Sequence, residues 1–413
     1  MPLGGLIAQS TESAPVVYWP SQSWEAQTPA AAGLDQAKLH RARDYALSHK
    51  STSFLVVRSG RIVLEAYGSG GGAGVARRIA SATKSMTSIL VGMAIDQGKL
   101  KLDQPVADFL PDWKDTRKEK ITIRHLLSMT SGLDPARAQR LPDGDQFVVN
   151  ASMPVKSAAG ASWQYNTPAY HMLFRILEKA TGSSLDTWTK EQMLAPLGMQ
   201  ATAWYSRPAG EVTNYFNVRC TARDMARFGL FVLRGGCWGE DRLVSESFFK
   251  AATTSSQELN PAYGLLFWLN ARKGHSAGGR KVDYRFPGAP RDLVACLGKG
   301  GQQILVIPSQ DLVIVRQGER PGDEGLAQRL VRIVLSAIEG GEFPDEPAGA
   351  ARQSPADLLA RMDSDANGKV SQEEFEKAGF ARRRPRLFAR IDANADGELS
   401  LEEIKEFSAR RRR

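Results

Sequence analysis

Six residues decide how this chain is interpreted: Ala80-Ser81-Ala82-Thr83-Lys84-Ser85. They contain a serine and, three residues later, a lysine, and residues at this spacing share one face of a helix. Apolar residues continue at helical spacing until Gly98, so the pattern predicts a helix from Ser81 to Gln97. A helix N-terminus favours developing negative charge, and a buried lysine gives up its proton more readily. The spacing therefore predicts a nucleophile, Ser81, and its base, Lys84.

This tetrapeptide is weak evidence by itself. A second copy occurs at Ser247-Phe248-Phe249-Lys250, and a simple helix N-cap explains Ser81 equally well. Two further stretches strengthen the case. Trp163-Gln164-Tyr165-Asn166-Thr167 comes before a helical pattern, and Gly298-Lys299-Gly300-Gly301-Gln302 lies between two strand patterns. Glycines in the second stretch leave room for a close approach of backbone and ligand. Taken singly, the tyrosine is also compatible with a packed aromatic, and the lysine with a surface turn.

Strand patterns occur at both ends of the first 340 residues and helical patterns between them. Two apolar runs around Ser59-Gly60 predict a hairpin over residues 54–67. Later strands are predicted over 263–269, 293–297, 303–307 and 312–316, followed by a helix over 326–338. The simplest arrangement is one antiparallel sheet built from both ends, with a helical lobe inserted. A cleft between two such lobes is a natural place for a site.

Taken in order, these motifs resemble the serine β-lactamase-related family, which includes class C β-lactamases, DD-peptidases, β-lactamase-like esterases and 6-aminohexanoate-oligomer hydrolases. The resemblance extends over about residues 35–338 and includes the flanking stretches Ile121–Leu127, Thr130–Leu133, Pro196–Met199 and Thr221–Gly229. It implies an α/β fold of the β-lactamase/DD-peptidase type, with an antiparallel sheet flanked by helices and an inserted α-helical lobe.

The resemblance also implies roles for individual residues. Ser81 is then the acylated nucleophile, and Lys84 holds or accepts its proton. Tyr165 matches the tyrosine of the family's Tyr-x-Asn element and passes a proton to the leaving group. Lys299 matches the lysine or histidine of the late strand motif and keeps the site electropositive. The backbone N–H groups of Ser81 and Gln302 form the oxyanion hole. Whether Lys84 or Tyr165 is the general base stays open at this point.

Two positions depart from the family pattern. The third residue of the Tyr-x-Asn element is Thr167, and Gly300, followed by Gly301, replaces the usual threonine or serine. We expect these three residues to contact the substrate, and their identity weakens the case for β-lactamase or D-amino-acid peptidase activity. The sequence therefore predicts hydrolysis of carboxylic esters or small amides, with β-lactamase or D-amino-acid peptidase activity as the alternative. A non-catalytic protein that binds a wall or polymer fragment is the alternative from another class.

Near the C-terminus two twelve-residue loops match the EF-hand pattern and begin 29 residues apart. Oxygen ligands at loop positions 1, 3, 5, 7, 9 and 12 surround Ca²⁺, and the glycine at position 6 makes the sharp turn. The predicted ligands are Asp363, Asp365, Asn367, Lys369, Ser371 and Glu374 in the first loop, and Asp392, Asn394, Asp396, Glu398, Ser400 and Glu403 in the second. We expect structural Ca²⁺ in a small all-α EF-hand domain, and no cofactor for catalysis.

The domain organisation follows from these motifs. We predict an N-terminal extension over residues 1–33, the hydrolase domain over 34–341, a Pro/Ala-rich linker over 342–355, and an EF-hand pair with a basic tail over 356–413. Calcium is plentiful outside the cytosol, which favours a secreted or periplasmic protein. No apolar run is long enough for a transmembrane segment.

The net charge of the 413 residues is +9, partly from two arginine clusters, Arg382–Arg384 and Arg410–Arg413. These clusters suit either a solvated surface or contact with an anionic surface. No aromatic residues alternate with them, so no nucleic-acid partner is expected.

Overall fold

The computed structural model describes residues 18–21, 23–137, 144–271, 284–322, 325–341, 355–365, 367–378 and 387–410. The chain divides into two compact units, residues 1–345 and 346–413, each with its own hydrophobic core. The predicted linker lies outside the described residues except for Pro355, and so do the cluster Arg382–Arg384 and residues 411–413. None of the described helices combines the length and apolar character needed to cross a membrane.

Among the described residues, the first unit is built on one antiparallel sheet with strand order β2-β1-β11-β10-β9-β8. Its strands are β1 (Ser51–Arg58), β2 (Arg61–Tyr67), β8 (Trp268–Leu269), β9 (Val294–Gly298), β10 (Gln302–Ile307) and β11 (Leu312–Gly318). The two ends of the domain meet where β1 pairs with β11, with Val57 opposite Val313. The predicted single sheet made from both ends of the domain is thus confirmed.

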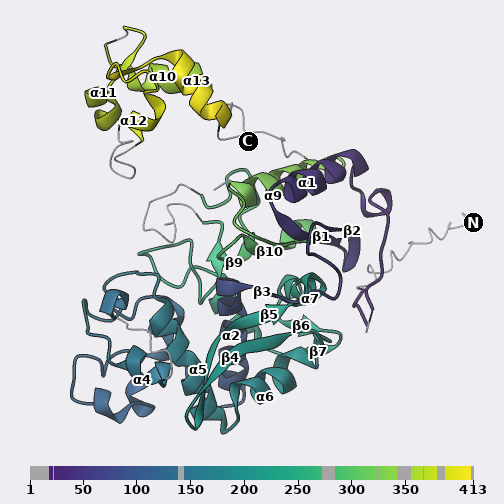
Figure 1. Ribbon diagram of the computed structural model, residues 1–413. Coiled ribbons are helices and arrows are strands. Elements are labelled where there is room, and N and C mark those ends of the chain that lie inside the picture. The colour runs from purple at the N-terminus through teal and green to yellow at the C-terminus, as the bar shows by residue number, and fades with distance from the viewer. Residues whose placement is uncertain are drawn as a thin grey trace, which may run out of the picture. The chain divides into compact units, whose positions relative to one another are not determined.

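Helices cover both faces of this sheet (Figure 1). The helices α1 (Gln36–Ser48) and α9 (Leu326–Ser336) pack together, and α1 packs on β1. The helix α7 (Ala222–Leu233) packs on β10 and β11 from the other side. Gly229 permits this close approach, because a Cβ atom there would lie 2.5 Å from the Val313 side chain. The apolar residues at helical spacing in α7 therefore become part of the main core.

The inserted lobe is largely helical. Its central helix is α2 (Thr83–Asp96), whose residues from Thr83 to Ala94 are all buried, and α5 (Thr167–Thr181) packs against it. The other helices of this unit are α3 (Ile123–Leu127), α4 (Gln146–Ala151), α6 (Leu185–Thr189) and α8 (Glu246–Thr253). Short helical turns are η1 (Ala30–Ala32), η2 (Ala80–Ala82), η3 (Val106–Asp108), η4 (Pro111–Trp113), η5 (Pro135–Arg137), η6 (Lys190–Leu194, a π turn) and η7 (Pro308–Gln310).

Two smaller sheets complete the first unit. One has the order β3-β5-β4 and consists of β3 (Arg77–Arg78), β5 (Val212–Cys220) and β4 (Ala203–Ala209). The other pairs β6 (Cys237–Trp238) with β7 (Asp241–Arg242). The first of these positions the predicted nucleophile, because β3 ends three residues before Ser81.

One strand prediction is wrong over most of its length. A strand was expected over residues 263–269, but only Trp268–Leu269 are extended and paired. Leu266 has a φ of 63°, and a Cβ atom on Gly264 would lie 2.1 Å from the Ala252 carbonyl oxygen. The chain therefore turns back on itself, and Tyr263 forms an isolated antiparallel bridge with Trp268. Periodicity cannot distinguish such a buried turn from a strand, because both are continuously apolar.

The second unit contains two helix-loop-helix hands. Its elements are α10 (Pro355–Met362), β12 (Val370–Ser371), α11 (Gln372–Lys377), α12 (Phe388–Ile391), β13 (Glu398–Leu399) and α13 (Leu401–Arg410). The two loops meet in a short antiparallel pair in which Val370 lies opposite Leu399, and both are fully buried. A small core that includes Phe375 and Phe388 holds the helices together.

Candidate active site and calcium loops

Ser81 lies in the turn η2, immediately before the long helix α2. The preceding residue, Ala80, has a φ of 48°, in the left-handed region that residues other than glycine rarely adopt. Neither η2 nor α2 has a side-chain cap. The Ser81 side chain therefore does not act as a helix N-cap, which was the alternative interpretation. A tight, strained turn instead places the hydroxyl at the start of α2.

The first turn of α2 is fixed from two sides. The Thr83 hydroxyl accepts a hydrogen bond from the Val218 backbone N–H at 3.0 Å, which ties the helix to β5. The Ser85 hydroxyl donates to the Leu266 carbonyl at 2.9 Å, which ties it to the turn before β8. Both residues are buried. The backbone around Ser81 is consequently held by two elements that are far away in sequence.

Lys84 is buried at 3% exposure and lies beside the predicted nucleophile. Its Nζ atom is 3.3 Å from Ser81 Oγ and 3.2 Å from Thr167 Oγ1. The rings of Tyr165 and Tyr170 lie 5.0 and 4.3 Å from the same nitrogen. Burial lowers the pKa of Lys84 to about 7. Among the described residues no carboxylate pairs with it, so near neutral pH this amine can both accept and return a proton.

Tyr165 comes from the segment just before α5 and is half-buried. Burial raises the pKa of its phenol, whereas a hydrogen bond with Ser81 and the positive charge of Arg285 act in the opposite direction. Its ring stacks on Trp268 with 5.9 Å between centroids and 13° between planes. The structure thus brings Ser81, Lys84 and Tyr165 together in one cluster.

The two residues after Tyr165 have different surroundings. Asn166 caps α5: its side chain accepts a hydrogen bond from the Ala169 N–H at 3.0 Å and donates to the Leu133 carbonyl at 2.9 Å. This asparagine is 2% exposed and its amide is engaged in holding the fold. The hydroxyl of Thr167 contacts the buried amine of Lys84 instead. Neither side chain therefore presents a free amide beside Lys84.

The glycine-rich stretch forms the turn between β9 and β10. Gly300 and Gly301 have φ values of 87° and 79°, which explains the need for glycine at both positions. The buried guanidinium of Arg316 binds their carbonyl oxygens at 3.0 and 2.8 Å. Lys299 is exposed in this turn, and within the described residues its ammonium group has no hydrogen bond or ion pair. Nothing in this geometry links Lys299 to Tyr165.

Gln302 begins β10, opposite Gly298. Its side chain donates to the Gly318 carbonyl at 2.5 Å, so it secures the end of β11. The turn nevertheless runs close to the nucleophile, because a Cβ atom on Gly298 would lie 2.1 Å from the Ile79 carbonyl oxygen. The assignment of the Ser81 and Gln302 N–H groups to an oxyanion hole stays a prediction.

Four residues of this cluster were not predicted from the sequence: Tyr170, Tyr263, Trp268 and Arg285. The rings of Tyr263 and Trp268 lie 4.7 Å apart and both face Tyr165. The Arg285 guanidinium lies 3.7 Å from the centroid of the Trp268 ring. Tyr170 lies on the helix predicted after Thr167, and the aromatic residues at 263–268 were expected only to form a strand. Tyr263, Trp268 and Arg285 reach the site through a turn and a loop, and neither has a periodicity that would reveal it.

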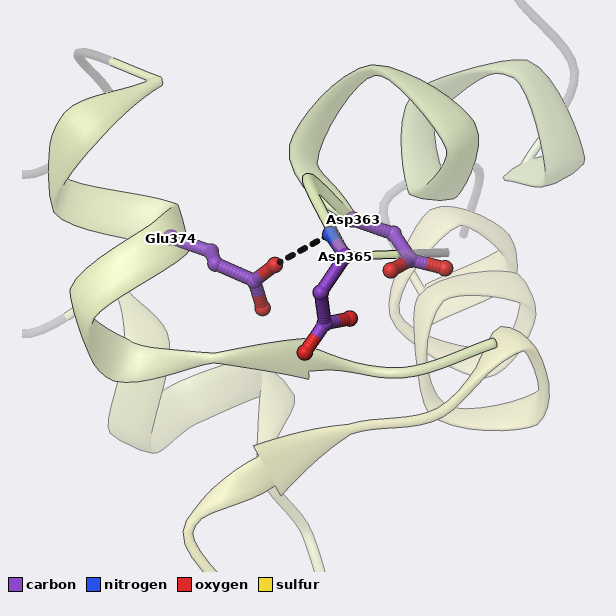
Figure 2. Close-up of side chains that lie close together, drawn as sticks. All are labelled: Asp363, Asp365 and Glu374. Atoms are coloured by element: carbon purple, nitrogen blue, oxygen red, sulfur yellow. Dashed lines mark hydrogen bonds between the residues drawn. The ribbon is translucent and has the colours of Figure 1, made fainter. Parts of the chain in front are cut away.

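In the second unit, the carboxylates of Asp363, Asp365 and Glu374 converge (Figure 2). One oxygen of each lies within 4.8 Å of the others, which fits a single cation. Hydrogen bonds from Ser371 and Ser364 lower the pKa of Glu374 to about 2, so it is ionised. The other predicted ligands, Asn367, Lys369 and Ser371, lie on the same loop, and Ser371 also caps α11.

In the second loop, Glu403 makes hydrogen bonds like those of Glu374 in the first. The Glu403 side chain accepts hydrogen bonds from the Ala393 and Ser400 backbone N–H groups, both at 2.9 Å. One carboxylate oxygen of Asp392 accepts from Gly397, while the other is buried without a partner. A buried anionic oxygen without a partner is costly, and a cation at this position would satisfy it. The ion pair between Lys369 and Glu398, at 2.5 Å, joins loop position 7 of the two hands.

Comparison with known proteins agrees with both units. A family model described as Beta-lactamase matches residues 38–337, and one described as EF hand matches residues 356–380 and 386–408. The chain belongs to the Beta-lactamase family, and its C-terminal unit is an EF-hand region. The expected family and fold class are thereby confirmed.

The chain is similar to proteins named as a hydrolase and an esterase. The 6-aminohexanoate-dimer hydrolase of Paenarthrobacter ureafaciens is 25% identical over 295 residues, which cover 65% of this chain and 72% of that protein. Esterase EstB of Burkholderia gladioli is 31% identical over 151 residues, 31% of this chain and 38% of that protein. The crystal structure of a penicillin-binding-protein homologue from Caulobacter crescentus aligns with a TM-score of 0.58 at 18% identity, covering 74% of this chain and 99% of that one. This last likeness concerns the fold alone.

Proposed function

We propose that this protein is a serine hydrolase that cleaves carboxylic esters or small amides through an acyl-Ser81 intermediate. The observation that carries the proposal is the buried amine of Lys84, which lies 3.3 Å from the Ser81 hydroxyl. Burial lowers its pKa to about 7, so a large fraction is neutral and able to accept the serine proton near neutral pH.

The reaction proceeds in two halves. The Ser81 oxygen attacks the carbonyl carbon while its proton moves to Lys84 or Tyr165, and the tetrahedral oxyanion is held by backbone N–H groups, for which Ser81 and Gln302 are the candidates. Collapse breaks the bond to the leaving group, which takes up a proton from Tyr165; where Lys84 received the serine proton, it passes that proton on to Tyr165. Water then attacks the acyl-serine carbonyl and gives a proton to the base. The base returns a proton to the Ser81 oxygen as the acyl bond breaks, which frees the carboxylic acid and restores the serine. Both Lys84 and Tyr165 contact Ser81, so the geometry suits either as the base.

The proposed substrate preference follows from Thr167. An amide side chain at this position would help to hold the amide of a β-lactam or peptide, but the Thr167 hydroxyl contacts Lys84 instead. This contact favours esters and simple amides over β-lactams and D-amino-acid peptides. It also disfavours a non-catalytic binding protein, because a buried lysine held between two hydroxyls is costly and serves no purpose in a mere binding cleft.

We further propose that the two loops of the C-terminal unit bind Ca²⁺. The convergent carboxylates of Asp363, Asp365 and Glu374 and the unpartnered buried oxygen of Asp392 fit this ion. The bound ions would supply positive charge that neutralises the loops and orders them, and they are assigned no step in the hydrolysis. A calcium-dependent module suits a secreted or periplasmic protein, where this ion is plentiful, and we propose that location.

The hydrolase proposal is tested by replacing Ser81 with alanine. Ser81→Ala should abolish ester turnover and covalent labelling by a fluorophosphonate probe, a loss of several orders of magnitude. Ser247→Ala is the matched control, because that serine begins the second Ser-x-x-Lys copy but is exposed on α8. Labelling that persists in Ser81→Ala would reject the proposed mechanism.

A further inference from the structure

The proposed site needs a second positive charge, a role that the family resemblance implies for Lys299. That lysine is exposed in the β9–β10 turn, and within the described residues no hydrogen bond joins its ammonium group to Ser81, Lys84 or Tyr165. Lys84 itself changes charge near neutral pH, so it cannot hold the site positive while it acts as a base. A different cation is therefore needed to keep the surroundings of Tyr165 electropositive.

Arg285 has the required position. Its guanidinium lies 3.7 Å from the centroid of Trp268, and Trp268 in turn stacks on Tyr165 with an interplanar angle of 13°. The Arg285 carbonyl accepts a hydrogen bond from the Gln328 side chain at 3.2 Å, which ties this loop to α9. The arginine therefore belongs to the aromatic wall of the site and is also fixed to the sheet's covering helix.

Among the described residues no carboxylate forms an ion pair with Arg285, and its Nε atom is buried without a hydrogen-bond partner. Burial lowers the pKa of the guanidinium to about 10, so it still carries its charge throughout the neutral range. Holding a cation in such largely apolar surroundings is costly, and strongly perturbed charged groups cluster at functional sites.

The field of Arg285 reaches the phenols of Tyr165 and Tyr263. The other groups that face Tyr165 are Ser81 from η2 and Lys84 from α2, together with the neutral phenol of Tyr170 from α5. No acidic side chain in the described part of the chain opposes the arginine in this cluster. Its positive charge therefore acts on Tyr165 through aromatic surroundings of low polarity, where charge interactions are stronger than in water.

We propose that Arg285 is a positioning residue for Tyr165, whose fixed positive charge favours the deprotonated phenol and the uncharged amine of Lys84 when the serine proton is taken up. This inference rests on the proposed serine hydrolase function and concerns a different residue. Arg285 does not exchange protons. It favours the deprotonated forms of Tyr165 and Lys84, which do, and so takes the role that the family resemblance implies for Lys299.

The test measures the rate of Ser81 labelling by a fluorophosphonate probe between pH 5.5 and 9 in the full-length protein. Arg285→Met removes the charge and keeps an apolar side chain on Trp268, whereas Arg285→Lys keeps a charge. Arg291→Met is the matched control, because Arg291 comes from the same loop but is exposed and stacks on Tyr284. Circular dichroism and melting temperature verify that each variant is folded.

In Arg285→Met we expect labelling at pH 7 to fall by about tenfold, the effect of losing one partly screened charge. Removal of a nearby cation makes deprotonation harder, so the acid limb of the profile should move to higher pH and the loss should shrink as pH rises. Arg285→Lys should largely restore the wild-type profile, and Arg291→Met should keep it. A folded Arg285→Met protein with a uniform loss at every pH would overturn the proposal in favour of a packing role.

An unchanged profile in folded Arg285→Met would also overturn it, and would leave the serine hydrolase proposal standing. Lys299→Met is compared in the same series: a larger shift of the acid limb in Lys299→Met than in Arg285→Met would return the electropositive role to Lys299. Failure of the wild-type protein to be labelled at all would instead reject the proposed function, and the inference with it.

Discussion

The amine nitrogen of Lys84 lies 3.2 Å from the hydroxyl oxygen of Thr167, a residue that stands where the family pattern has asparagine. Thr167 comes from the start of α5 and Lys84 from α2, so the bond joins two helices across the site. The hydroxyl holds the amine at a fixed place beside Ser81. The orientation of the proposed base consequently depends on Thr167.

Replacing Thr167 with valine tests this dependence. Valine keeps the shape of the side chain and removes the hydroxyl, so Lys84 loses one of its two hydroxyl partners. We expect kcat for p-nitrophenyl acetate to fall by about tenfold, in line with the loss of one hydrogen bond to a charged or polar group. Thr167→Ser keeps the hydroxyl and should retain most of the activity. Equal rates for Thr167→Val and the wild type would show that the contact does not orient the base.

The pH dependence of activity should follow Lys84. Because burial lowers its pKa to about 7, the amine becomes protonated as the pH falls below that value and can no longer accept the serine proton. We therefore expect kcat/KM for esters to drop on the acid side of pH 7, and Lys84→Met to be inactive at every pH. An acid limb near pH 5, measured with the same ester, would argue that another group serves as the base.

Lys84 should also affect stability, in a direction fixed by linkage. Its folded-state pKa of about 7 lies below the ordinary value of 10.5, so the unfolded chain binds more protons between these two values. The contribution of Lys84 to stability is fully present above the unfolded pKa and is lost as pH falls toward 7. Across this window the wild-type protein should gain a few kcal/mol relative to Lys84→Met. Parallel urea melts at pH 7 and pH 10 measure the difference; a constant difference would contradict the shifted pKa.

Substrate preference provides a separate prediction. Short-chain p-nitrophenyl esters should be hydrolysed with a much higher kcat/KM than nitrocefin, because Thr167 cannot present the amide group of an asparagine. D-Ala-D-Ala peptides and linear ω-amino-acid oligomers complete the panel and separate the peptidase and amidase branches. If nitrocefin or the D-Ala-D-Ala peptide proves the best substrate, the alternative function is the right one.

The Arg316 guanidinium should be a major stabilising group of the β9–β10 turn. It is fully buried and donates to the carbonyls of Gly300 and Gly301 and to the Ser51 hydroxyl. Arg316→Met would leave several buried carbonyls without a donor, each worth about 1–3 kcal/mol. We expect a loss of roughly 3 kcal/mol or more in the free energy of unfolding by urea. Arg124→Met is the control, since the exposed pair with Asp103 should contribute less than about 1 kcal/mol.

The parts of the site whose residues are close together in the sequence could be predicted from the sequence. Ser81 and Lys84 share a helical turn, and the two calcium loops are contiguous, so their geometry follows from local rules. The sheet could be inferred because its strands are apolar runs between clear turns. By contrast, Arg285 and Trp268 reach the site through a turn and a loop without periodicity. The exposure of Lys299 could not be foreseen either, because the turn that carries it is shaped by hydrogen bonds from Arg316, a residue of another strand, to Gly300 and Gly301.

The two units of the chain have separate cores, one formed by residues between Leu34 and Ile338 and the other by residues between Met362 and Ile404. All of the proposed catalytic residues belong to the first unit and all of the proposed calcium ligands to the second. A chain ending at Gly341 should therefore fold and hydrolyse esters with a kcat close to that of the full-length protein. The comparison uses the same ester, with both proteins measured with Ca²⁺ and with a chelator.

Calcium should stabilise the second unit and leave catalysis nearly unchanged. Without metal, the carboxylates of Asp363, Asp365 and Glu374 repel one another within 4.8 Å, and Asp392 retains a buried oxygen without a partner. Binding to the folded loops alone stabilises them by mass action, so the melting transition of this unit should rise with Ca²⁺ concentration. Glu374→Gln, which removes one charge from the first loop, should weaken that rise without altering ester kcat. Two results would contradict the proposed independence of the two units. One is a loss of ester hydrolysis when a chelator is added to the full-length protein, and the other is a shortened chain that folds but is inactive. Either result would mean that the second unit acts on the active site.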